Sequence, residues 1–418
     1  MKKKLLIIMI FVVLIISSIL VYFFAFNKDK KTTKKKEKIT YTDVKEDTNI
    51  KINNDLTLEF GDNKSLSDYI TIDNSEFKDK EITYDELGTK KIEFSYKDAD
   101  GKINYRFINI DVVDTTSPYA SVPSYKKIKV NSDISFIDDF LCADNHDRVL
   151  EKRLDGEFDL LREGTYTVKF VAVDSSENKT EKTFILDVVA ELPKPSSGGG
   201  SSQINYLNYS DLYNQYKNSN TKIGIDISRW QGDVDFKKLK ENNVEFIMIR
   251  LGGQDGIDGE YYIDSKFTQN ITGALENGFD VGVYFYSYAH TKEDAINQAK
   301  YVMDHLKGYK ITLPIVFDWE CWNKFNKMGM SLFDLKNVQE TFINEVEKKG
   351  YTGSRYGSKN YLTNLWLPSN KITWLAHYVS NTTYEGEYYM WQRCDTGKVS
   401  GINGAVDVDI LYLDKYKI

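Results

Sequence analysis

The sequence is poor in the residues that build most metal centres and disulfide frameworks. Its 418 residues include three cysteines, Cys142, Cys321 and Cys394, which are odd in number, widely spaced and outside any C-x-x-C pattern. The four histidines show no metal-ligand spacing either. We therefore expect neither a disulfide framework nor a metal ion or other cofactor.

The chain also lacks an excess of positive charge. Lysine and arginine number 55 against 62 aspartate and glutamate residues, so the formal net charge is −7. Binding to the phosphates of nucleic acid needs a basic face. The charge balance therefore argues against a nucleic-acid partner.

Charged residues are absent from one long stretch at the amino terminus, residues 5–26. A helix of this length spans about 33 Å, enough to cross a bilayer. Ser17-Ser18 and Ala25 make poor cleavage sites for a signal peptidase. We expect residues 1–4 to be a cytoplasmic end and residues 5–26 an uncleaved, single-pass signal anchor, with a cleaved signal peptide as the alternative.

A lysine-rich linker is predicted at residues 27–40. It holds seven lysines between Lys28 and Lys38, against three before the apolar stretch, and this asymmetry alone would place the rest of the chain in the cytoplasm. The basic run is a candidate contact for anionic lipid headgroups or anionic wall polymer, with a solvated linker as the alternative.

Residues 41–114 and 115–190 are predicted to be two copies of one all-β sandwich domain. Period-two segments split by turn residues indicate a half-buried hairpin in each copy. The segments Gly88-Thr89, Phe94, Asp98 and Asp111-Val112-Val113 recur 76 positions later as Gly164-Thr165, Phe170, Asp174 and Asp187-Val188-Val189. The pattern, with Asp114-Thr-Thr-Ser-Pro118 at the junction, resembles bacterial immunoglobulin-like domains, which are mostly spacers; an adhesive or wall-binding role is the alternative.

Residues 191–220 are predicted to be a flexible Pro/Gly/Ser linker and lead-in. From residue 221 to residue 418, strand and helix patterns alternate, and about five helices fall among the first five strands. The strand candidates are 223–228, 245–251, 280–287, 313–320, 353–357, 373–378, 388–393 and 405–412. The expected fold is an α/β modified TIM-type (β/α) barrel with few helices in its last third.

Two carboxylates end the apolar run that starts at Leu313. Asp318 and Glu320 are one residue apart, so on a strand they face the same way with Cα atoms roughly 6.5–7 Å apart. Catalytic groups of barrels lie at the carboxyl ends of strands, which favours an active site over a pair of solvated loop acids. Other predicted strand ends carry Asp226, Arg250, Tyr284, Tyr286, Trp391 and Gln392, and the last strand holds Asp407 and Asp409. Such a carboxylate-rich cleft with aromatic residues is typical of a glycosidase.

Five segments in order resemble the motifs of glycoside hydrolase family 25, the muramidases of bacteria and their phages. The resemblance covers about residues 221–413 and implies hydrolysis of the β-1,4 bond from N-acetylmuramic acid to N-acetylglucosamine in peptidoglycan glycan strands. The segments are Asp226-Ile-Ser-Arg-Trp-Gln-Gly232, Asp318-Trp-Glu320, Trp374-Leu-Ala-His-Tyr378, Trp391-Gln392 and Gly401-Ile-Asn-Gly-Ala-Val-Asp407.

The resemblance implies four catalytic carboxyl groups. Glu320 takes the role of general acid, and the like charge of Asp318 would raise its pKa. Asp318 would stay ionised and either stabilise an oxocarbenium-like transition state or orient the 2-acetamido group of the sugar. Asp226 and Asp407 would activate water or position groups. Retaining, inverting and substrate-assisted mechanisms all remain open.

Seven further residues are expected to bind substrate. Five are aromatic and suit stacking or hydrogen bonding to sugars, with barrel packing as the alternative: Tyr286, Tyr356, Trp374, Tyr378 and Trp391. Gln392 belongs to the same set. Arg250 would meet a carboxylate of the muramyl group or stem peptide, or else pair with one of the acids.

Two features depart from the family pattern. Leu251-Gly252-Gly253 leads into an insertion-like segment at 254–259, which affects the expected substrate contacts there. Cys321 directly follows Glu320, and Cys394 comes two positions after Gln392. We expect buried apolar thiols, with a disulfide between them as the alternative.

Taken together, these patterns predict a monomeric muramidase of the cell membrane whose catalytic domain faces the cell wall outside. The location of peptidoglycan decides this orientation against the lysine count. The alternative is a non-cleaving peptidoglycan-binding or adhesive surface protein. The presence of all four carboxylates argues against loss of catalysis.

Overall fold

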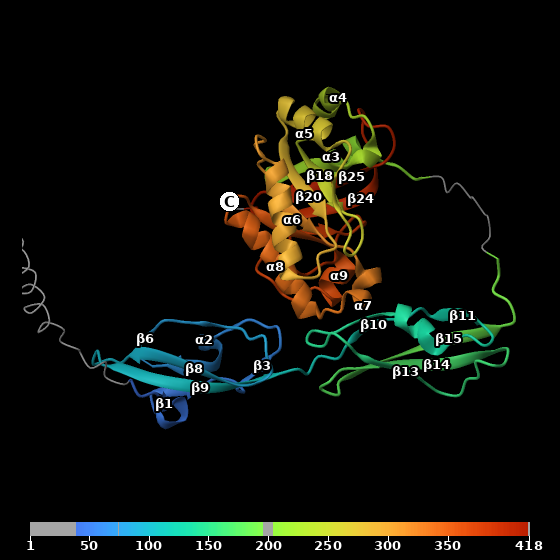
Figure 1. Ribbon diagram of the computed structural model, residues 1–418. Coiled ribbons are helices and arrows are strands. Elements are labelled where there is room, and N and C mark those ends of the chain that lie inside the picture. Colours follow the sequence, from blue (N-terminus) through green and yellow to red (C-terminus); the bar gives the residue numbers. More distant parts are fainter. Residues whose placement is uncertain (1–38, 74, 195–203, 417–418) are drawn as a thin grey trace, which may run out of the picture. The chain divides into compact units, whose positions relative to one another are not determined.

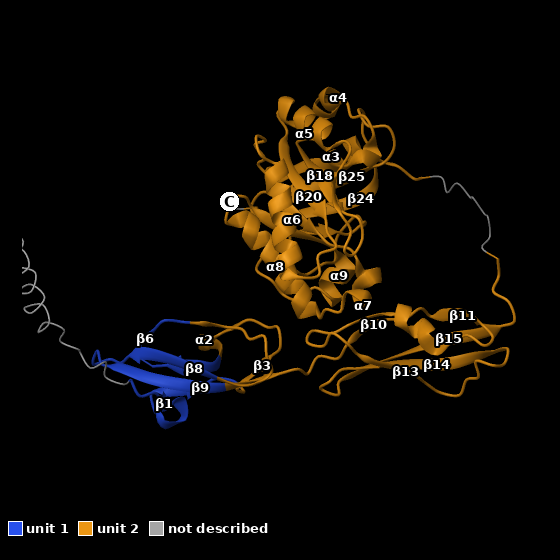
Figure 2. Cartoon of the chain, viewed as in Figure 1, with its two compact units in different colours: residues 1–54, 69–79, 91–109 blue, residues 55–68, 80–90, 110–418 orange. Residues whose placement is uncertain are grey.

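The computed structural model describes residues 39–73, 75–194 and 204–416, which divide into two compact units (Figure 1, Figure 2). The first comprises the described residues up to 54 together with 69–79 and 91–109, and the second comprises 55–68, 80–90 and the described residues from 110 onward. The predicted anchor at 5–26 lies outside the described residues. Within the described ranges, no helix combines the length and the apolar character that a bilayer crossing requires.

The first unit is built of short strands around one long hairpin. In it, β1 pairs in parallel with β9, β6 pairs antiparallel with β8, and β2 pairs antiparallel with β5. Buried residues alternate along β8, at Ile92, Phe94 and Tyr96, as a half-buried strand requires. The elements are β1 (Thr42–Asp43), η2 (Val44–Glu46), β2 (Ile50–Ile52), β5 (Ile70–Ile72), β6 (Glu76–Phe77) and most of β8 (Gly88–Lys97) and β9 (Ile103–Val113).

The second unit holds a second β region between residues 119 and 189. A four-stranded sheet has the order β11-β15-β14-β13, and β10 pairs with β12. Both sheets contribute to one core, which contains Ala120 and Cys142 from the small sheet and Phe170 and Phe184 from the large one. The elements are β10 (Tyr119–Ser121), β11 (Tyr125–Lys129), η3 (Ile134–Asp139), β12 (Leu141–Ala143), β13 (Glu151–Asp155), β14 (Gly164–Val173) and β15 (Lys179–Val189), with β3 (Thr57–Glu59), β4 (Lys64–Ser65), α2 (Leu66–Tyr69) and β7 (Glu81–Ile82) from the earlier part of this unit.

The two predicted repeats form matching hairpins. The bounds of β8 and β9 recur 76 positions later as those of β14 and β15. The side chain of Thr89 donates to Asp111 at 2.5 Å, and Thr165 donates to Asp187 at 3.0 Å in the same register. Kinship with immunoglobulin-like domains stays a prediction.

An eight-stranded closed barrel, as predicted, occupies the carboxyl-terminal part of the second unit. Seven neighbouring strands run parallel, and the last strand, β25, closes the barrel by pairing antiparallel with both β17 and β24. The eight strands are β17 (Thr221–Ile227), β18 (Phe246–Gln254), β20 (Asp280–Tyr286), β21 (Ile315–Asp318), β22 (Gly353–Ser358), β23 (Thr373–Ala376), β24 (Met390–Lys398) and β25 (Val406–Tyr412). The reversed direction of β25 was not expected from the sequence.

Most of the helices around the barrel lie in the connections between its first five strands. Capping boxes begin α6 at Thr291 with Asp294 and α8 at Ser331 with Asp334, as the sequence indicates. Among the described residues no helix lies between β23 and β25, which confirms the expected lack of helices in the last third. The helical segments are α3 (Tyr209–Tyr216), η4 (Arg229–Gln231), α4 (Phe236–Glu241), α5 (Phe267–Glu276), α6 (Lys292–His305), η5 (Trp322–Lys324), α7 (Phe325–Met328), α8 (Leu332–Glu347) and α9 (Lys359–Asn364), and two short strands, β16 (Leu207–Asn208) and β19 (Tyr261–Ile263), extend the sheet.

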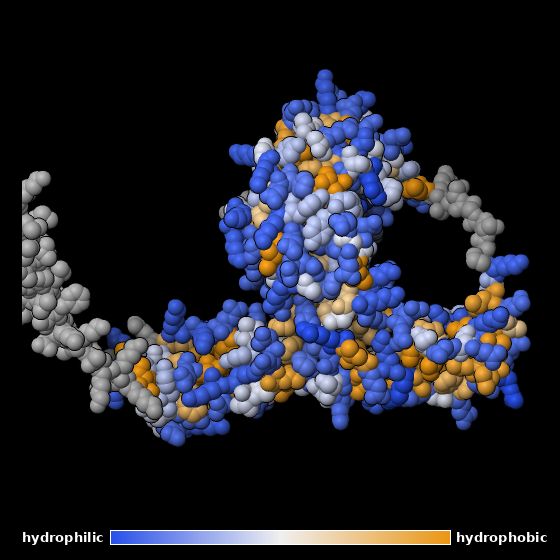
Figure 3. Space-filling model, viewed as in Figure 1, coloured by the Kyte–Doolittle hydropathy of each residue, from blue (hydrophilic) through white to orange (hydrophobic). Residues whose placement is uncertain are grey.

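The barrel strands are buried on both faces. One cluster lies between strands and helices, and a second, smaller cluster includes Met248, Val316, Trp374 and Met390. Burial on both faces explains why these strands have apolar runs rather than alternation. Hydrophilic residues dominate the face seen in Figure 3.

Part of the predicted linker belongs to the barrel. Residues 195–203 lie outside the described residues, but the lead-in from 204 contains β16 and α3. Tyr209 of α3 is buried, and its hydroxyl donates to the carbonyl of Ile223 at 3.0 Å.

Candidate active site

The paired acids lie at the carboxyl end of β21, but the strand is shorter than expected. It ends at Asp318, so Trp319 and Glu320 follow it rather than continue it. Trp319 is fully buried, and its indole nitrogen donates to the carbonyl of Ala289 at 3.0 Å. This anchor turns the chain so that the carboxyl groups of Asp318 and Glu320 come within hydrogen-bonding reach of each other.

The antiparallel direction of β25 brings Asp407 to the same end of the barrel. Asp407 is the second residue of β25, and its backbone lies opposite Asp226, which is near the end of β17. The start of an antiparallel strand thus lies beside the carboxyl ends of its parallel neighbours. Asp409, two residues further, is fully buried and accepts a hydrogen bond from the indole of Trp374 at 2.9 Å.

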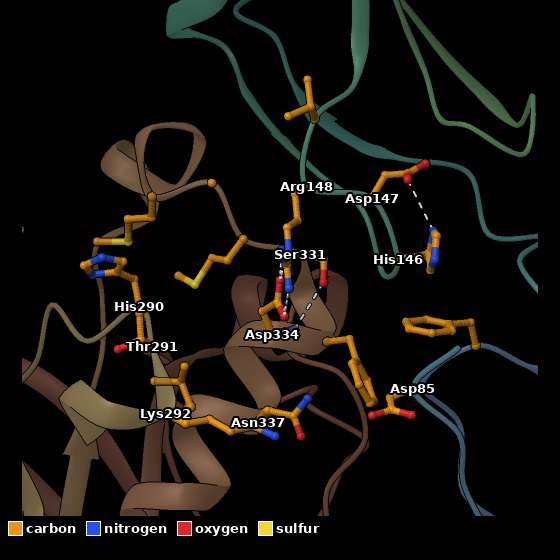
Figure 4. A pocket seen from close by; sticks show the side chains of 17 residues that line it. Asp85, His146, Asp147, Arg148, His290, Thr291, Lys292, Ser331, Asp334 and Asn337 are labelled. Carbon is orange, nitrogen blue, oxygen red and sulfur yellow. Dashed lines mark hydrogen bonds and ion pairs between the residues drawn. The ribbon is translucent and has the colours of Figure 1, made fainter. Parts of the chain in front are cut away.

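A cleft of about 280 Å³ opens at this end of the barrel. It gathers the four predicted catalytic carboxylates and six of the seven predicted substrate-binding residues. Its lining comprises Asp226, Ser228, Trp230, Gln231, Arg250, Tyr284, Tyr286, Asp318, Glu320, Tyr356, Trp374, Tyr378, Gln392 and Asp407. A larger hollow of about 890 Å³, drawn in Figure 4, contains none of the predicted site residues.

Gln392 organises one wall of the cleft. Its amide nitrogen donates to Asp226 Oδ2 at 2.8 Å and to Asp407 Oδ2 at 3.3 Å. Its amide oxygen accepts from the hydroxyls of Tyr356 at 2.8 Å and Tyr378 at 2.9 Å. Both donors and both acceptor positions of the amide are therefore used, which fixes the orientation of the two aspartates.

The cleft raises the pKa of each of its carboxyl groups. Burial is the main cause at Asp226, with the charge of Asp409 next, and burial followed by the charge of Asp226 raises the pKa of Asp407 to about 9. Asp318 is buried, and loss of water together with the charge of Glu320 raises its pKa well above the ordinary value. These groups hold protons at pH values where an exposed aspartate is ionised.

Glu320 differs from Asp318 because its side chain is exposed to solvent in the cleft. The surrounding walls still remove part of its water and raise its pKa, whereas the hydrogen bond with Asp318 and the charge of Arg250 lower it. The pKa is therefore raised at both acids, with burial as the main cause at each. The two carboxyls act as one pair that shares protons.

Arg250 is the only cation that lines the described cleft. Its guanidinium lies 5.2 Å from the ring centroid of Tyr286 and hydrogen-bonds the hydroxyl of Tyr262. Among the described residues it forms no ion pair with a carboxylate, and its Nε has no hydrogen-bond partner. Within the described ranges, Arg250 therefore does not form the structural ion pair that was the alternative. Its Nε is a hydrogen-bond donor without a partner next to the cleft.

Trp391 does not line the cleft. Its ring packs edge-on against Tyr216, with centroids 5.7 Å apart, and its indole donates to the carbonyl of His377. Side chains alternate along β24, so Gln392 faces the cleft and Trp391 the opposite side. For Trp391 the packing alternative holds.

Three cleft residues were missed although they lie inside a recognised motif. Ser228, Trp230 and Gln231 come from the loop and η4 that follow β17, where Ser228 and Gln231 form a capping box. The side chain of Trp230 is 72% exposed. A tryptophan left exposed at the rim of a cleft is an available stacking surface, and its place within Asp226–Gly232 was the signal for it.

The insertion-like segment 254–259 lies outside the cleft lining. Here β18 continues to Gln254 and pairs with β19, and a Cβ on Gly252 would come within 1.9 Å of the Tyr262 carbonyl oxygen. The glycines therefore permit the close approach of β19. Cys321 and Cys394 are buried free thiols, so no disulfide joins them.

Comparisons with known proteins match the part of the chain that forms the barrel. Residues 225–402 match the model of Glycosyl hydrolases family 25. An autolytic lysozyme of Clostridium acetobutylicum is 29% identical over 189 residues, which are 44% of this chain and 54% of that protein. Lysozyme M1 of Streptomyces globisporus is 27% identical over 202 residues, 44% of this chain and 65% of that protein.

One similar solved structure is the modular autolysin LytC of Streptococcus pneumoniae in complex with a synthetic peptidoglycan ligand. It is 24% identical to this chain, with a TM-score of 0.42. The match covers 58% of this chain and 56% of that one. The chain spans about half to two thirds of the length of the two lysozymes above. The family match falls on the barrel strands that carry the cleft, from β17 to the segment before β25. Residues 225–402 therefore match glycosyl hydrolases family 25.

Proposed function

We propose that the barrel, residues 221–418, hydrolyses the β-1,4 bond between N-acetylmuramic acid and N-acetylglucosamine in peptidoglycan. The observation that carries the proposal is the group of four carboxyls with raised pKa values around one cleft of a family 25 domain. The names of the related lysozymes support the same substrate class. The aromatic lining supplies flat apolar surfaces of the kind that sugar rings contact.

Glu320 is the general acid in this proposal. It must hold a proton near neutral pH and reach the oxygen of the leaving sugar, and it alone of the paired acids is exposed in the cleft. As the glycosidic bond breaks, the Glu320 proton passes to the leaving oxygen; a water molecule then supplies the hydroxyl of the anomeric carbon, and its released proton restores the acid. Asp318 stabilises the positive charge that develops on the sugar, or orients its 2-acetamido group.

Asp226 and Asp407 position the reacting groups from the opposite wall. Their link through Gln392 holds both carboxyls in one arrangement. Arg250, with its free Nε, is suited to a carboxylate of the muramyl lactate or stem peptide. Trp230 and Tyr378, which is 48% exposed, are suited to stacking on sugars at the rim.

The function is tested by the release of reducing ends from purified peptidoglycan by the full-length chain. Glu320→Gln keeps the size of the side chain and removes the acid, and we expect a loss of rate of roughly 10²–10⁴-fold. Glu276→Gln, an exposed position on α5, is the matched control and should retain full rate. Equal activity of the Glu320→Gln variant would contradict the proposal, and binding to peptidoglycan without cleavage by the wild-type chain would replace it with a binding function.

The cellular setting is a separate proposal. Residues 5–26 would anchor the chain in the cell membrane, the two β regions would act as immunoglobulin-like spacers, and the barrel would face the wall as a monomer. Protease added to intact cells should then digest residues 41–418. Complete protection of that region would place it inside the cell.

A further inference from the structure

Three aspartates of the second unit are distant in the sequence but close together in space, and each directly follows a strand. Asp114 follows β9, Asp144 follows β12 and Asp174 follows β14. All three are buried, and one carboxylate oxygen of each lies within 4.8 Å of those of the other two. An ion placed between three such oxygens lies roughly 2.8 Å or less from each, close to the 2.3–2.6 Å of calcium–oxygen bonds.

Hydrogen bonds from residues 176 and 178 reach both oxygens of Asp174, but the other two carboxylates are only partly satisfied. Asp144 Oδ1 accepts from the backbone nitrogens of His146 and Asp147, both at 2.8 Å, whereas Asp144 Oδ2 has no partner. Neither oxygen of Asp114 accepts a hydrogen bond of good geometry within the described ranges, although the Asn145 amide and the Thr116 backbone nitrogen lie near enough to lower its pKa. The exposed fractions of Asp144 and Asp114 are 1% and 7%.

Asn145, which follows Asp144 in the chain, also has an unpartnered side-chain oxygen. The side chain of Asn145 is 3% exposed and lies against the carboxyl of Asp114. Its amide nitrogen donates to Glu59 and to the carbonyl of Phe60, but its Oδ1 accepts no hydrogen bond. Asn145 lowers the pKa of Asp114 as a hydrogen-bond donor, so its amide nitrogen lies on the side of that carboxyl.

Positive charge is lacking around the cluster. Among the described residues, no lysine or arginine forms an ion pair with Asp114, Asp144 or Asp174. The charges that act on Asp114 are those of Asp174 and Glu59, and those on Asp144 are Asp114 and Asp174. Buried like charges without a counterion destabilise a fold strongly.

We propose that Asp114, Asp144 and Asp174 bind a Ca²⁺ ion. The donors are all carboxylate oxygens, which are ligands that Ca²⁺ prefers. A second group, Asp114, His146 and Asp147, shares Asp114, and Figure 4 shows Asp147 turned toward His146. That group contains an imidazole, so Zn²⁺ is the competing ion there.

The first unit contains a matched loop without the cluster. Asp98 follows β8 as Asp174 follows β14, and each carboxylate accepts from the backbone nitrogens two and four residues later. Asp98 belongs to no group of three acidic or histidine side chains among the described residues. The loop therefore needs the aspartate for its turn, and the proposed ion depends on Asp114 and Asp144.

The test is calcium binding to the full-length chain by isothermal titration calorimetry after removal of metal with a chelator. We expect one Ca²⁺ per chain with a Kd of about 10⁻³ M or tighter. Asp114→Asn and Asp144→Asn should each weaken binding by about tenfold or more, because each removes a charged ligand. Asp174→Asn should also weaken it, and its matched control Asp98→Asn should not.

The melting temperature of the wild-type chain tests ion binding without any substitution. Ca²⁺ should raise the melting temperature of the wild-type chain, and Mg²⁺ should raise it less. In chelator, Asp144→Asn should melt no lower than wild type, because it removes a repelling charge. Absence of calcium binding by the wild-type chain, equal binding by the Asp114→Asn and Asp144→Asn variants, or binding of Zn²⁺ alone would each overturn the proposal. None of these outcomes bears on peptidoglycan cleavage.

Discussion

Two groups of buried acids in this protein differ in what their oxygens contact. In the barrel, side-chain donors reach Asp226 and Asp407 through Gln392, and a cleft of about 280 Å³ gives access from solvent. In the second β region, backbone nitrogens hold one side of Asp144, and its other oxygen has no hydrogen-bond partner among the described residues. Identical carboxyl groups are thus arranged in one place to hold protons that a substrate can reach, and in the other to surround a cation.

The largest difference should be seen when one acid of each group is neutralised. Asp318→Asn should lower kcat by roughly 10²–10³-fold, because the charge that stabilises the transition state is lost. Asp144→Asn should leave kcat unchanged. Steady-state rates on soluble peptidoglycan fragments measure both, and a comparable loss for Asp144→Asn would show that the two groups are coupled.

Gln392→Leu tests whether the amide positions the two aspartates of the cleft. Loss of all four hydrogen bonds should release Asp226 and Asp407 from their arrangement and lower kcat by up to about 10²-fold, since displacement near 1 Å can have that effect. Gln339→Leu is the matched control: Gln339 is fully buried, and both polar atoms of its side chain lack partners. It should retain the rate and fold at least as stably.

The pKa of Asp407 predicts a fall in stability with rising pH. The folded chain holds this proton up to about pH 9, whereas the unfolded chain releases it near 3.8. The native state thus binds more protons in this window, so the free energy of unfolding decreases as pH rises from about 4 to 9. Asp407→Asn should flatten this decrease in denaturant titrations at several pH values. The exposed Asp233→Asn should leave it unchanged.

The smallest effect on rate is expected at the aromatic positions. Trp230→Ala should raise KM by roughly twofold to tenfold through lost stacking, with little change in stability. Trp391→Ala should instead reduce the free energy of unfolding by about 3–5 kcal/mol, because its ring is buried outside the cleft. A change in KM for Trp391→Ala without loss of stability would return Trp391 to the substrate site.

Much of the barrel could be predicted because its signals are local. Apolar runs mark strands, capping boxes mark α6 and α8, and ordered motifs identify the domain. Asp226, Asp318, Glu320 and Asp407 followed from these motifs. The direction of β25 could not be predicted in this way, because the pattern of buried residues along a strand does not show whether the strand runs parallel or antiparallel to its neighbours.

Other features depend on distant contacts that no motif records. Trp374 and Trp391 occupy similar strand positions, yet one lines the cleft and the other packs on Tyr216. Glu320 lies beyond β21 because Trp319 is anchored to Ala289. The spacing of cysteine and histidine in the sequence indicates no metal site. The three clustered aspartates lie at the ends of strands that are distant in the sequence, and only the fold brings them together.

The most direct test of the proposed activity is the identity of the new reducing end. Products from purified peptidoglycan, treated with borohydride and analysed by mass spectrometry, should carry reduced N-acetylmuramic acid. Their yield should fall to background with the Glu320→Gln variant. Reduced N-acetylglucosamine at the new ends would contradict the account, because it would show that the opposite glycosidic bond is cleaved.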